Sequence, residues 1–466
     1  MAKEFLTIDR REAQYRDNRL KDFKDVEVRA DKEEMLNQAL RCMECGIPFC
    51  HSAGCPLGNY IPEINRAVTV DAMEYAYNLL SQESPFPEFT SRICPALCES
   101  ACCANLPSKP VNVKQLEYLV IEEAFKAGLV KPLTPKTRSS KTVAVIGAGP
   151  SGLAAAHYLN GMGYNVVVFE KALSAGGLLR YGIPDFKLEK HIVERRIDLM
   201  RQAGVVFEFS VEIGKDISAN YINKKFDAIC LCIGCEVPRD LKIEGRDFKN
   251  IHFALDYLRS QLKFNSGENK TLEIDAKGKK VLVIGGGDTG SDCMGTALRQ
   301  GATEVVQIEI MPEPPVERHT ATPWPQWEYK KRTSSSHKEG GTRMWDVSSK
   351  KFVADKDGNV AKLVASKVDW GVNETSMPSK FEEVANSEFE IEADLVLLSM
   401  GFVSVASPKL IEELSVNLSQ RGAIAGSQNA KVFSCGDCAS GASLVVRAIA
   451  MAKDTVKEID TFLRNS

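Results

Sequence analysis

The feature that most constrains the fold is a strand–turn–helix–strand pattern that occurs twice along the chain. The first copy, KTVAVIGAGPSGLAAAHYLNGMGYNVVVFE, begins at Lys141, and its glycines follow an apolar strand as Gly147-x-Gly149-x-x-Gly152. These glycines permit a tight turn, close approach of the backbone to a pyrophosphate, and packing of the helix on the strand. The helix N-terminus then stabilises the phosphate charge. Glu170, at the end of the second strand, is placed to accept a hydrogen bond from a ribose hydroxyl.

A second copy of this pattern, KVLVIGGGDTGSDCMGTALRQGATEVVQIEI, begins at Lys280. It repeats the glycine spacing, and an acidic residue again ends the next strand. Its candidate contacts are Gly285, Gly287, Asp288, Thr289, Gly290 and Glu309. Two such fingerprints imply two bound dinucleotides. This combination indicates a flavoprotein that also binds a nicotinamide coenzyme.

The first copy is the predicted FAD site, because the glycine turn Gly176-Gly177 follows its second strand. A carboxyl-terminal strand–turn–helix pattern, VFSCGDCASGASLVVRAIAMAK, is placed to return to this site. There Asp437 would bond the ribityl chain, the alternative being an acidic surface turn. The candidate FAD contacts are Gly147, Gly149, Gly152, Glu170, Gly177, Leu178, Gly436 and Asp437.

This arrangement predicts a discontinuous FAD domain, 141–248 and 405–466, with an NAD(P)H-binding domain, 249–404, inserted in it. The segments CLCIGCEVPR (230–239) and LVLLSMGF (395–402) are the predicted crossings between the two domains.

Eight cysteines lie in two short runs near the amino terminus, CMECGIPFCHSAGCP and CPALCESACC. Ordinary buried thiols rarely fall at C-x2-C spacing, whereas structural zinc sites and iron–sulfur clusters both use it. Cysteine followed by proline closes a ferredoxin-type ligand run, and Cys55-Pro56 and Cys94-Pro95 both have this form. A flavin can pass the electrons of a nicotinamide singly to an iron–sulfur cluster, but zinc accepts none. We therefore favour iron–sulfur clusters over zinc.

The length, charge and apolar content of the chain narrow the class of protein further. A chain of 466 residues predicts two to four domains. Residues 1–140 have helical patterns, including one helix capped by Asp31 and one that ends at Gly128, and a Pro- and Ser-containing linker follows at 131–141. A net charge of −3 with mixed signs argues against a nucleic-acid partner. The polar amino terminus and the lack of an apolar run of about twenty residues predict a cytoplasmic protein without a membrane partner.

Several longer motifs resemble a known family. The segments RCMECGIPFCHSAGCPLGN, FPEFTSRICPALCESAC, GGLLRYGIPDFKLEK, GGGDTGSDC and PWPQW are similar to those of the small (beta) subunit of bacterial-type glutamate synthase, from about Phe5 to Lys453. The resemblance implies that NAD(P)H is oxidised at FAD and that electrons leave through 4Fe–4S clusters toward FMN in a large (alpha) subunit. That subunit converts L-glutamine and 2-oxoglutarate to L-glutamate. The implied fold is α/β, with an α-helical iron–sulfur domain, 1–140, before two Rossmann-like domains, the second inserted in the first.

The resemblance extends to the amino-terminal domain of dihydropyrimidine dehydrogenase, which implies ligands for two 4Fe–4S clusters. Those implied for the first cluster are Cys42, Cys45, Cys50 and Cys102. Those implied for the second are Cys55, Cys94, Cys98 and, as a non-cysteine ligand, Glu117. The alternative for Glu117 is a solvated helix residue, and Cys103 is the spare thiol in this assignment.

Two residues bear on the choice of coenzyme, and they favour different ones. The carboxylate of Glu309 suits the free 2′-hydroxyl of NADH, whereas Arg318 is placed to bind the 2′-phosphate of NADPH. The family uses both coenzymes, and NADPH is expected here. The segment 328–343 departs from the family pattern and is predicted to be a surface loop of the nicotinamide domain.

Two other functions are compatible with the same residues. One is the large subunit of a flavin-based NAD(P)H:ferredoxin-type oxidoreductase or transhydrogenase. The other is a non-catalytic scaffold subunit that binds FAD and zinc. Departures from the family at Arg447 and Ala452-Lys453, near the expected flavin ring, predict a changed flavin potential or coenzyme reactivity.

Overall fold

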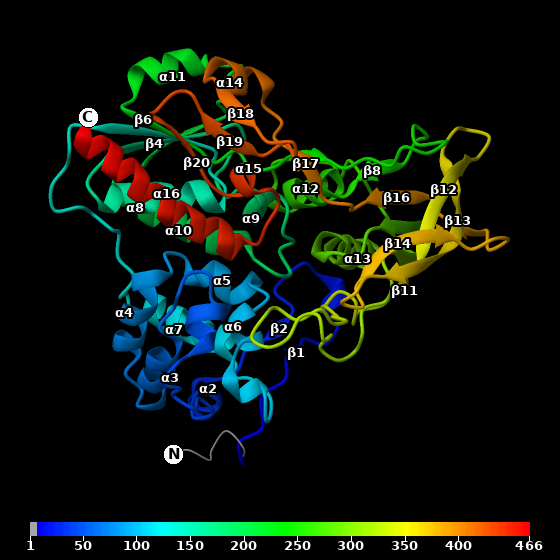
Figure 1. The fold of residues 1–466 in the computed structure, drawn as a ribbon, viewed down its shortest axis with the longest axis horizontal. Coiled ribbons are helices and arrows are strands. Elements are labelled where there is room, and N and C mark those ends of the chain that lie inside the picture. The colour runs from blue at the N-terminus through cyan, green and yellow to red at the C-terminus, as the bar shows by residue number, and fades with distance from the viewer. Residues whose placement is uncertain (1–6) are drawn as a thin grey trace.

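The structure is a computed structural model that describes residues 7–466. The first six residues of the predicted 1–140 domain, including Phe5, lie outside the described residues. Three parts can be seen in Figure 1: a helical part in blue and cyan, a Rossmann-like unit that combines green and red segments, and a second unit in green, yellow and orange. The predicted α/β fold class is confirmed.

The helical part contains both helices that the sequence predicts. Its helices are α2 (Lys32–Ala39), α3 (Ile61–Thr69), α4 (Met73–Glu83), α5 (Pro87–Ile93), α6 (Leu97–Ser100) and α7 (Val113–Lys126), and a short antiparallel pair, β1 (Gln14–Tyr15) with β2 (Glu27–Val28), precedes them. The Asp31 carboxylate accepts a hydrogen bond from the backbone N–H of Glu34 at 2.8 Å, so it is the N-cap of α2.

The first Rossmann-like unit is a five-stranded parallel sheet in the order β20-β6-β3-β4-β5. Its strands are β3 (Thr142–Ile146), β4 (Asn165–Glu170), β5 (Val206–Phe209), β6 (Ala228–Leu231) and β20 (Val432–Ser434). The helices α8 (Pro150–Gly161), α10 (Lys190–Gln202) and α16 (Val445–Asn465) cover one face, while α11 (Ala219–Lys225) and α14 (Pro408–Glu413) cover the other. Since β20 comes from near the carboxyl terminus, this unit is built from two separate stretches of chain.

The second unit is also a five-stranded parallel sheet, in the order β11-β10-β9-β16-β8. Its strands are β8 (Ile251–Phe253), β9 (Lys280–Ile284), β10 (Glu304–Ile308), β11 (Thr342–Met344) and β16 (Leu395–Leu398). The helices α12 (Ala254–Ser266) and α13 (Asp288–Gln300) bury one face of this sheet.

An antiparallel sheet, which the sequence does not predict, covers the other face of the second unit. It is formed by β12 (Val347–Ala354), β13 (Val360–Val372), β14 (Pro378–Glu383) and β15 (Phe389–Glu392). Phe352 and Leu363 from this sheet share a buried cluster with Leu282 of β9. The antiparallel sheet therefore takes the place of a helical layer.

The chain crosses between the two units at a short antiparallel ribbon. β7 (Val237–Pro238) pairs with β17 (Phe402–Ser404), so both crossings lie side by side. The second Rossmann-like unit is thus inserted in the first, which confirms this part of the predicted architecture. Near the carboxyl end, β18 (Val416–Leu418) pairs with β19 (Ile424–Ser427) before β20.

The segment 309–341, between β10 and β11, contains no helix or strand. The sequence predicts a surface loop over 328–343, and for part of it this is wrong. Ser336 is fully buried, and the Glu339 side chain is 1% exposed because it forms ion pairs with Arg299 at 2.7 Å and Arg19 at 2.9 Å. The loop therefore joins the helical part to the second unit.

Among residues 7–466, no helix combines the length and the apolar character that a membrane crossing requires.

Candidate flavin, coenzyme and cluster sites

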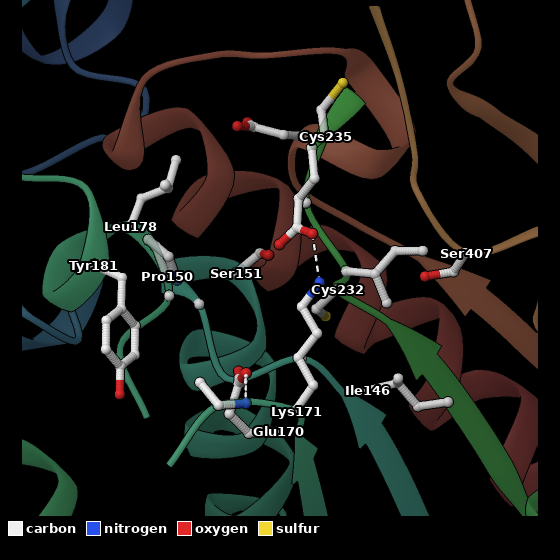
Figure 2. A pocket seen from close by; sticks show the side chains of 18 of the residues that line it. Ile146, Pro150, Ser151, Glu170, Lys171, Leu178, Tyr181, Cys232, Cys235 and Ser407 are labelled. Atoms are coloured by element: carbon white, nitrogen blue, oxygen red, sulfur yellow. Dashed lines mark hydrogen bonds and ion pairs between the residues drawn. The ribbon is translucent and has the colours of Figure 1, made fainter. Parts of the chain in front are cut away.

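A cavity of about 360 Å³ opens at the carboxyl ends of the strands of the first unit. This is the edge at which parallel α/β sheets bind ligands. The predicted FAD residues that line it are Gly147, Gly149, Glu170, Gly177, Leu178 and Asp437. Figure 2 shows Glu170, Leu178 and Tyr181 around this cavity. Gly152 and Gly436 do not line it.

Gly152 instead fixes the turn that bounds the cavity. A Cβ added to Gly152 would lie 1.9 Å from the carbonyl oxygen of Gly147, so only glycine allows α8 to pack this closely on the turn. Gly147 has a φ of +102°, a backbone conformation that favours glycine. Gly149 differs from both: its φ is −75°, and a Cβ there would have no neighbour nearer than 3.9 Å. Its lack of a side chain leaves room in the cavity.

Glu170 has a structural partner as well as a place in the cavity wall. Its carboxylate accepts hydrogen bonds from the backbone N–H of Ala148 at 2.8 Å and of Ala172 at 2.9 Å. The carboxylate therefore ties the glycine turn to the end of β4. Sequence reasoning expects a ribose contact here and misses this hydrogen-bonding role.

Asp437 begins α15 (Asp437–Ser440) and also lines the cavity. Burial raises the pKa of this carboxyl, and hydrogen bonds from the backbone N–H and hydroxyl of Ser443, at 3.1 and 2.8 Å, oppose the rise. A half-buried carboxylate held in this way can accept from a ligand hydroxyl group.

Further lining residues are missed by sequence reasoning. Lys171, next to the predicted Glu170, forms an ion pair with Glu236. Arg259 and Lys263 reach the cavity from α12 of the second unit. The fold alone brings α12 to this wall, so no local pattern could have identified these two cations.

The predicted coenzyme contacts gather at the amino end of α13. Gly285 has a φ of +120°, and a Cβ at Gly290 would lie 2.4 Å from the carbonyl oxygen of Gly285. Gly287 and the neighbouring Asp288 are exposed, Thr289 follows in the first turn, and a Cβ at Gly287 would have no neighbour within 4 Å. The second turn thus resembles the first. In each, two glycines are required by tight packing or by the backbone conformation, and the third has open space beside it.

Glu309 repeats the role of Glu170. Its carboxylate accepts hydrogen bonds from the backbone N–H of Gly286 at 2.5 Å and of Met311 at 3.2 Å. In each unit, an acidic residue at or just after the end of the second strand of the fingerprint holds the glycine turn.

Arg318 lies within the 309–341 segment and is extensively bonded. Its guanidinium donates to the carbonyl oxygens of Thr322 at 3.0 Å and Gln326 at 2.7 Å, and to the hydroxyl of Ser100 at 3.1 Å. It also pairs with Glu328 at 3.3 Å. The arginine joins this segment to the end of α6, and its role toward a 2′-phosphate stays a prediction.

The cysteines implied for the first cluster surround one small cavity of the helical part. Its lining includes Cys42, Cys45, Cys50, Cys102 and the spare thiol Cys103. Burial raises the pKa of Cys45 to about 12, with the neighbouring thiol of Cys103 adding to the rise, and burial also raises the pKa of Cys50. Thiols in such a site become thiolates when a metal centre supplies the positive charge. This donor set suits an iron–sulfur cluster.

The residues implied for the second cluster also come together. Glu117, on α7, is only 8% exposed, so the alternative of a solvated helix residue is wrong. Burial raises its pKa to about 7, while the hydrogen bond from the Asn59 amide at 2.7 Å lowers it. Burial raises the pKa of Cys55 and of Cys98, and the Glu117 charge adds to both rises, which places these groups in one local environment.

The second cysteine group connects two buried cores. Cys98 belongs to the core of the helical part together with Cys50 and Cys102, and Cys55 packs against that core. Cys55 and Cys94 also pack against the core of the first Rossmann-like unit. The second group therefore reaches from the core that holds the first group to the unit that contains the large cavity.

Comparisons with known proteins agree with this arrangement. One matching family model is described as dihydropyrimidine dehydrogenase domain II, 4Fe-4S cluster, over residues 19–129, and another as pyridine nucleotide-disulphide oxidoreductase, over 141–452. In fold, the chain is similar to FprA of Mycobacterium tuberculosis in complex with NADPH, with a TM-score of 0.56, 18% identity, and coverage of 70% of this chain and 85% of that chain.

Two relatives are much closer in sequence. The glutamate synthase [NADPH] small chain of Mycobacterium tuberculosis is 44% identical over 96% of this chain and 92% of its own length. The glutamate synthase [NADH] of Saccharomyces cerevisiae is 42% identical over 98% of this chain, which spans 22% of the yeast protein. Because the first similarity extends over nearly the whole of both chains, this chain belongs to the glutamate synthase small-chain family.

Proposed function

We propose that this chain is the electron-input subunit of a glutamate synthase. It oxidises NAD(P)H at FAD and delivers the electrons through 4Fe–4S clusters to a large subunit, which forms L-glutamate from L-glutamine and 2-oxoglutarate. The observation that supports this best is the order of the sites: a dinucleotide cavity, then the Cys55 group against its core, then the Cys50 group in the helical part. Such an order suits electron transfer in one direction.

The large cavity is assigned to FAD. Gly149 leaves space for a pyrophosphate beside the amino end of α8, where the helix dipole favours negative charge. Glu170 and Asp437, which both line the cavity, offer carboxylates to hydroxyl groups of the ligand. When bound, a flavin exchanges electron pairs with a nicotinamide and single electrons with an iron–sulfur cluster.

The cysteine groups are assigned to two clusters. The first is assigned the four sulfur ligands Cys42, Cys45, Cys50 and Cys102. The second is assigned Cys55, Cys94, Cys98 and the carboxylate of Glu117. Burial of Glu117 beside these thiols supports its place as the fourth ligand. The partner is assigned as a large subunit that carries FMN, and the complex is assigned to the cytoplasm.

The isolated chain is expected to reduce ferricyanide with NADPH but to form no glutamate. The coenzyme and flavin sites belong to this chain, whereas the family's large subunit contains the cysteine that releases ammonia from glutamine. The test is an anaerobic assay of both reactions with the purified chain, repeated after a large subunit is added. Glutamate formed by the lone chain would refute the division of labour, and failure to reduce ferricyanide would refute the electron-input role.

The Arg318→Ala variant is expected to lose NADPH preference. A charge-assisted hydrogen bond to a phosphate contributes about 1.5–3 kcal/mol, so kcat/KM for NADPH should fall roughly 10- to 100-fold more than kcat/KM for NADH. Loss of the bonds to Thr322, Gln326 and Ser100 should affect both coenzymes equally. An equal fall with NADPH and NADH would therefore limit Arg318 to joining its segment to α6.

A further inference from the structure

Three cysteines outside the predicted clusters meet in the core of the first Rossmann-like unit. The sulfur of Cys232 lies 3.6 Å from that of Cys230 and 3.4 Å from that of Cys435, and the remaining sulfur pair is 3.9 Å apart. All three side chains are buried. We call these three residues the thiol trio.

The sheet register brings the trio together. Cys230 lies within β6, and Cys232 directly follows that strand, so the two side chains point to the same face. The last paired residues of β6 and β20 are Leu231 and Ser434, and Cys435 comes next, opposite Cys232. The face they share is packed with apolar residues of α8 and α16. Three thiols thus occupy one point of an otherwise apolar layer.

The sulfur separations match a shared metal ion. A point equidistant from three sulfurs so spaced lies about 2.1 Å from each, close to the roughly 2.3 Å of a zinc–thiolate bond. They do not match a disulfide, whose sulfurs are about 2.05 Å apart. Among residues 7–466, only this group of Cys, His and acidic side chains has all its ligand atoms within 4.8 Å of one another.

The number of ligands favours one type of ion. Structural zinc sites take four protein ligands, and the trio has three. The nearby thiol of Cys438 is committed elsewhere, because it donates to the carbonyl oxygens of Leu231 and Cys435, both at 3.2 Å. Soft thiolate sulfurs select Cu⁺, zinc and iron–sulfur clusters, and because this site has only three sulfurs we assign it to Cu⁺.

The surroundings can stabilise thiolate charge. The trio lies beside the first turn of α8: the Ser151 hydroxyl bonds to the Cys435 thiol, and a Cβ on Gly152 would lie 3.2 Å from the Cys232 Cβ. The amino end of a helix favours negative charge.

An ion also has a way into the site. Cys232 lines the large cavity, as Figure 2 shows, so an ion can reach the trio through that cavity before the dinucleotide is bound. Each thiol that binds as a thiolate releases its proton to solvent.

We propose that Cys230, Cys232 and Cys435 form a three-thiolate site for one thiophilic closed-shell ion, with Cu⁺ preferred over Zn²⁺. None of the three is a predicted cluster ligand, and of the three only Cys232 lines the cavity assigned to FAD. The test is metal analysis of the flavin-containing full-length protein from cells grown with added copper salt. Wild type, Cys435→Ser and the matched control Cys438→Ser are compared, with iron and flavin measured in each sample.

About one copper per chain is expected in wild type and Cys438→Ser, with at least a tenfold loss in Cys435→Ser at unchanged iron and flavin. X-ray absorption of the wild-type copper should show sulfur neighbours only. If Cys435→Ser does not fold, Cys230→Ser takes its place. One zinc per chain that disappears with Cys435 would support the site and refute the preference for Cu⁺. Neither metal in wild type, or copper retained in the trio variant, would refute the site and leave three thiols that only pack the core.

Discussion

Cys50→Ala is expected to abolish glutamate formation by the assembled enzyme while sparing most ferricyanide reduction. Cys50 is buried in the core of the helical part and lines the cavity of the first cysteine group. Loss of one of the four assigned cluster ligands should remove the one-electron exit, so glutamate formation should fall by roughly two orders of magnitude or more. The proposed flavin and coenzyme sites lie in other parts of the chain, so ferricyanide reduction should stay within about threefold.

Cys103→Ala is the matched control for this variant. Cys103 lines the same cavity but is the spare thiol of the assignment. It should retain wild-type iron content and glutamate formation, whereas Cys50→Ala should lose about half of the iron of two clusters. If Cys103→Ala loses the iron and Cys50→Ala does not, the ligand set is wrong. Full coupling in Cys50→Ala would refute the electron route.

Gly152→Ala and Gly149→Ala are expected to fail in different ways. A methyl group at Gly152 would lie 1.9 Å from the Gly147 carbonyl oxygen, and backbone cannot yield cheaply. The free energy of unfolding of this domain should fall by about 3 kcal/mol, a value typical of severe overpacking. A methyl group at Gly149 meets nothing nearer than 3.9 Å, so the flavin-free Gly149→Ala variant should be as stable as the flavin-free wild type.

The flavin content separates the two variants further. Gly149 lines the large cavity, so its methyl group competes with the ligand itself. A clash of about 1–3 kcal/mol weakens FAD binding roughly 10- to 100-fold. Hydrogen exchange of α8 in flavin-free protein measures stability, and titration with FAD measures affinity. Equal destabilisation by both substitutions would show that Gly149 is a packing glycine and does not face the ligand.

Local patterns in the sequence were sufficient for much of the fold. The Asp31 cap and the Gly147 turn each depend on residues a few positions apart, so their geometry follows from the local sequence. The antiparallel sheet was missed for a physical reason. β14 is exposed along nearly its whole length, so it lacks the alternation of buried and exposed side chains that marks a strand.

The site residues, too, could be predicted only where they lie close together in the sequence. The glycines and acids of both turns were identified because each group is short in sequence. The thiol trio was not, because Cys232 and Cys435 are 203 residues apart and meet only through the pairing of β6 with β20. Glu339 was expected at the surface because it lies in a polar segment. Its burial depends on Arg19 and Arg299, which come from two other parts of the chain.

The ribbon formed by β7 and β17 also suggests where the inserted unit could be removed from the chain. Pro238 and Phe402 are direct cross-strand partners, so the polypeptide leaves and re-enters the first Rossmann-like unit at neighbouring points. A two- or three-residue turn between them would bridge the gap, because adjacent antiparallel strands can be joined by a tight hairpin turn. The second unit can therefore be treated as a separable insert. Its excision should leave the first unit with an unbroken parallel sheet, and a homologous insert with another coenzyme preference could be grafted at the same two residues.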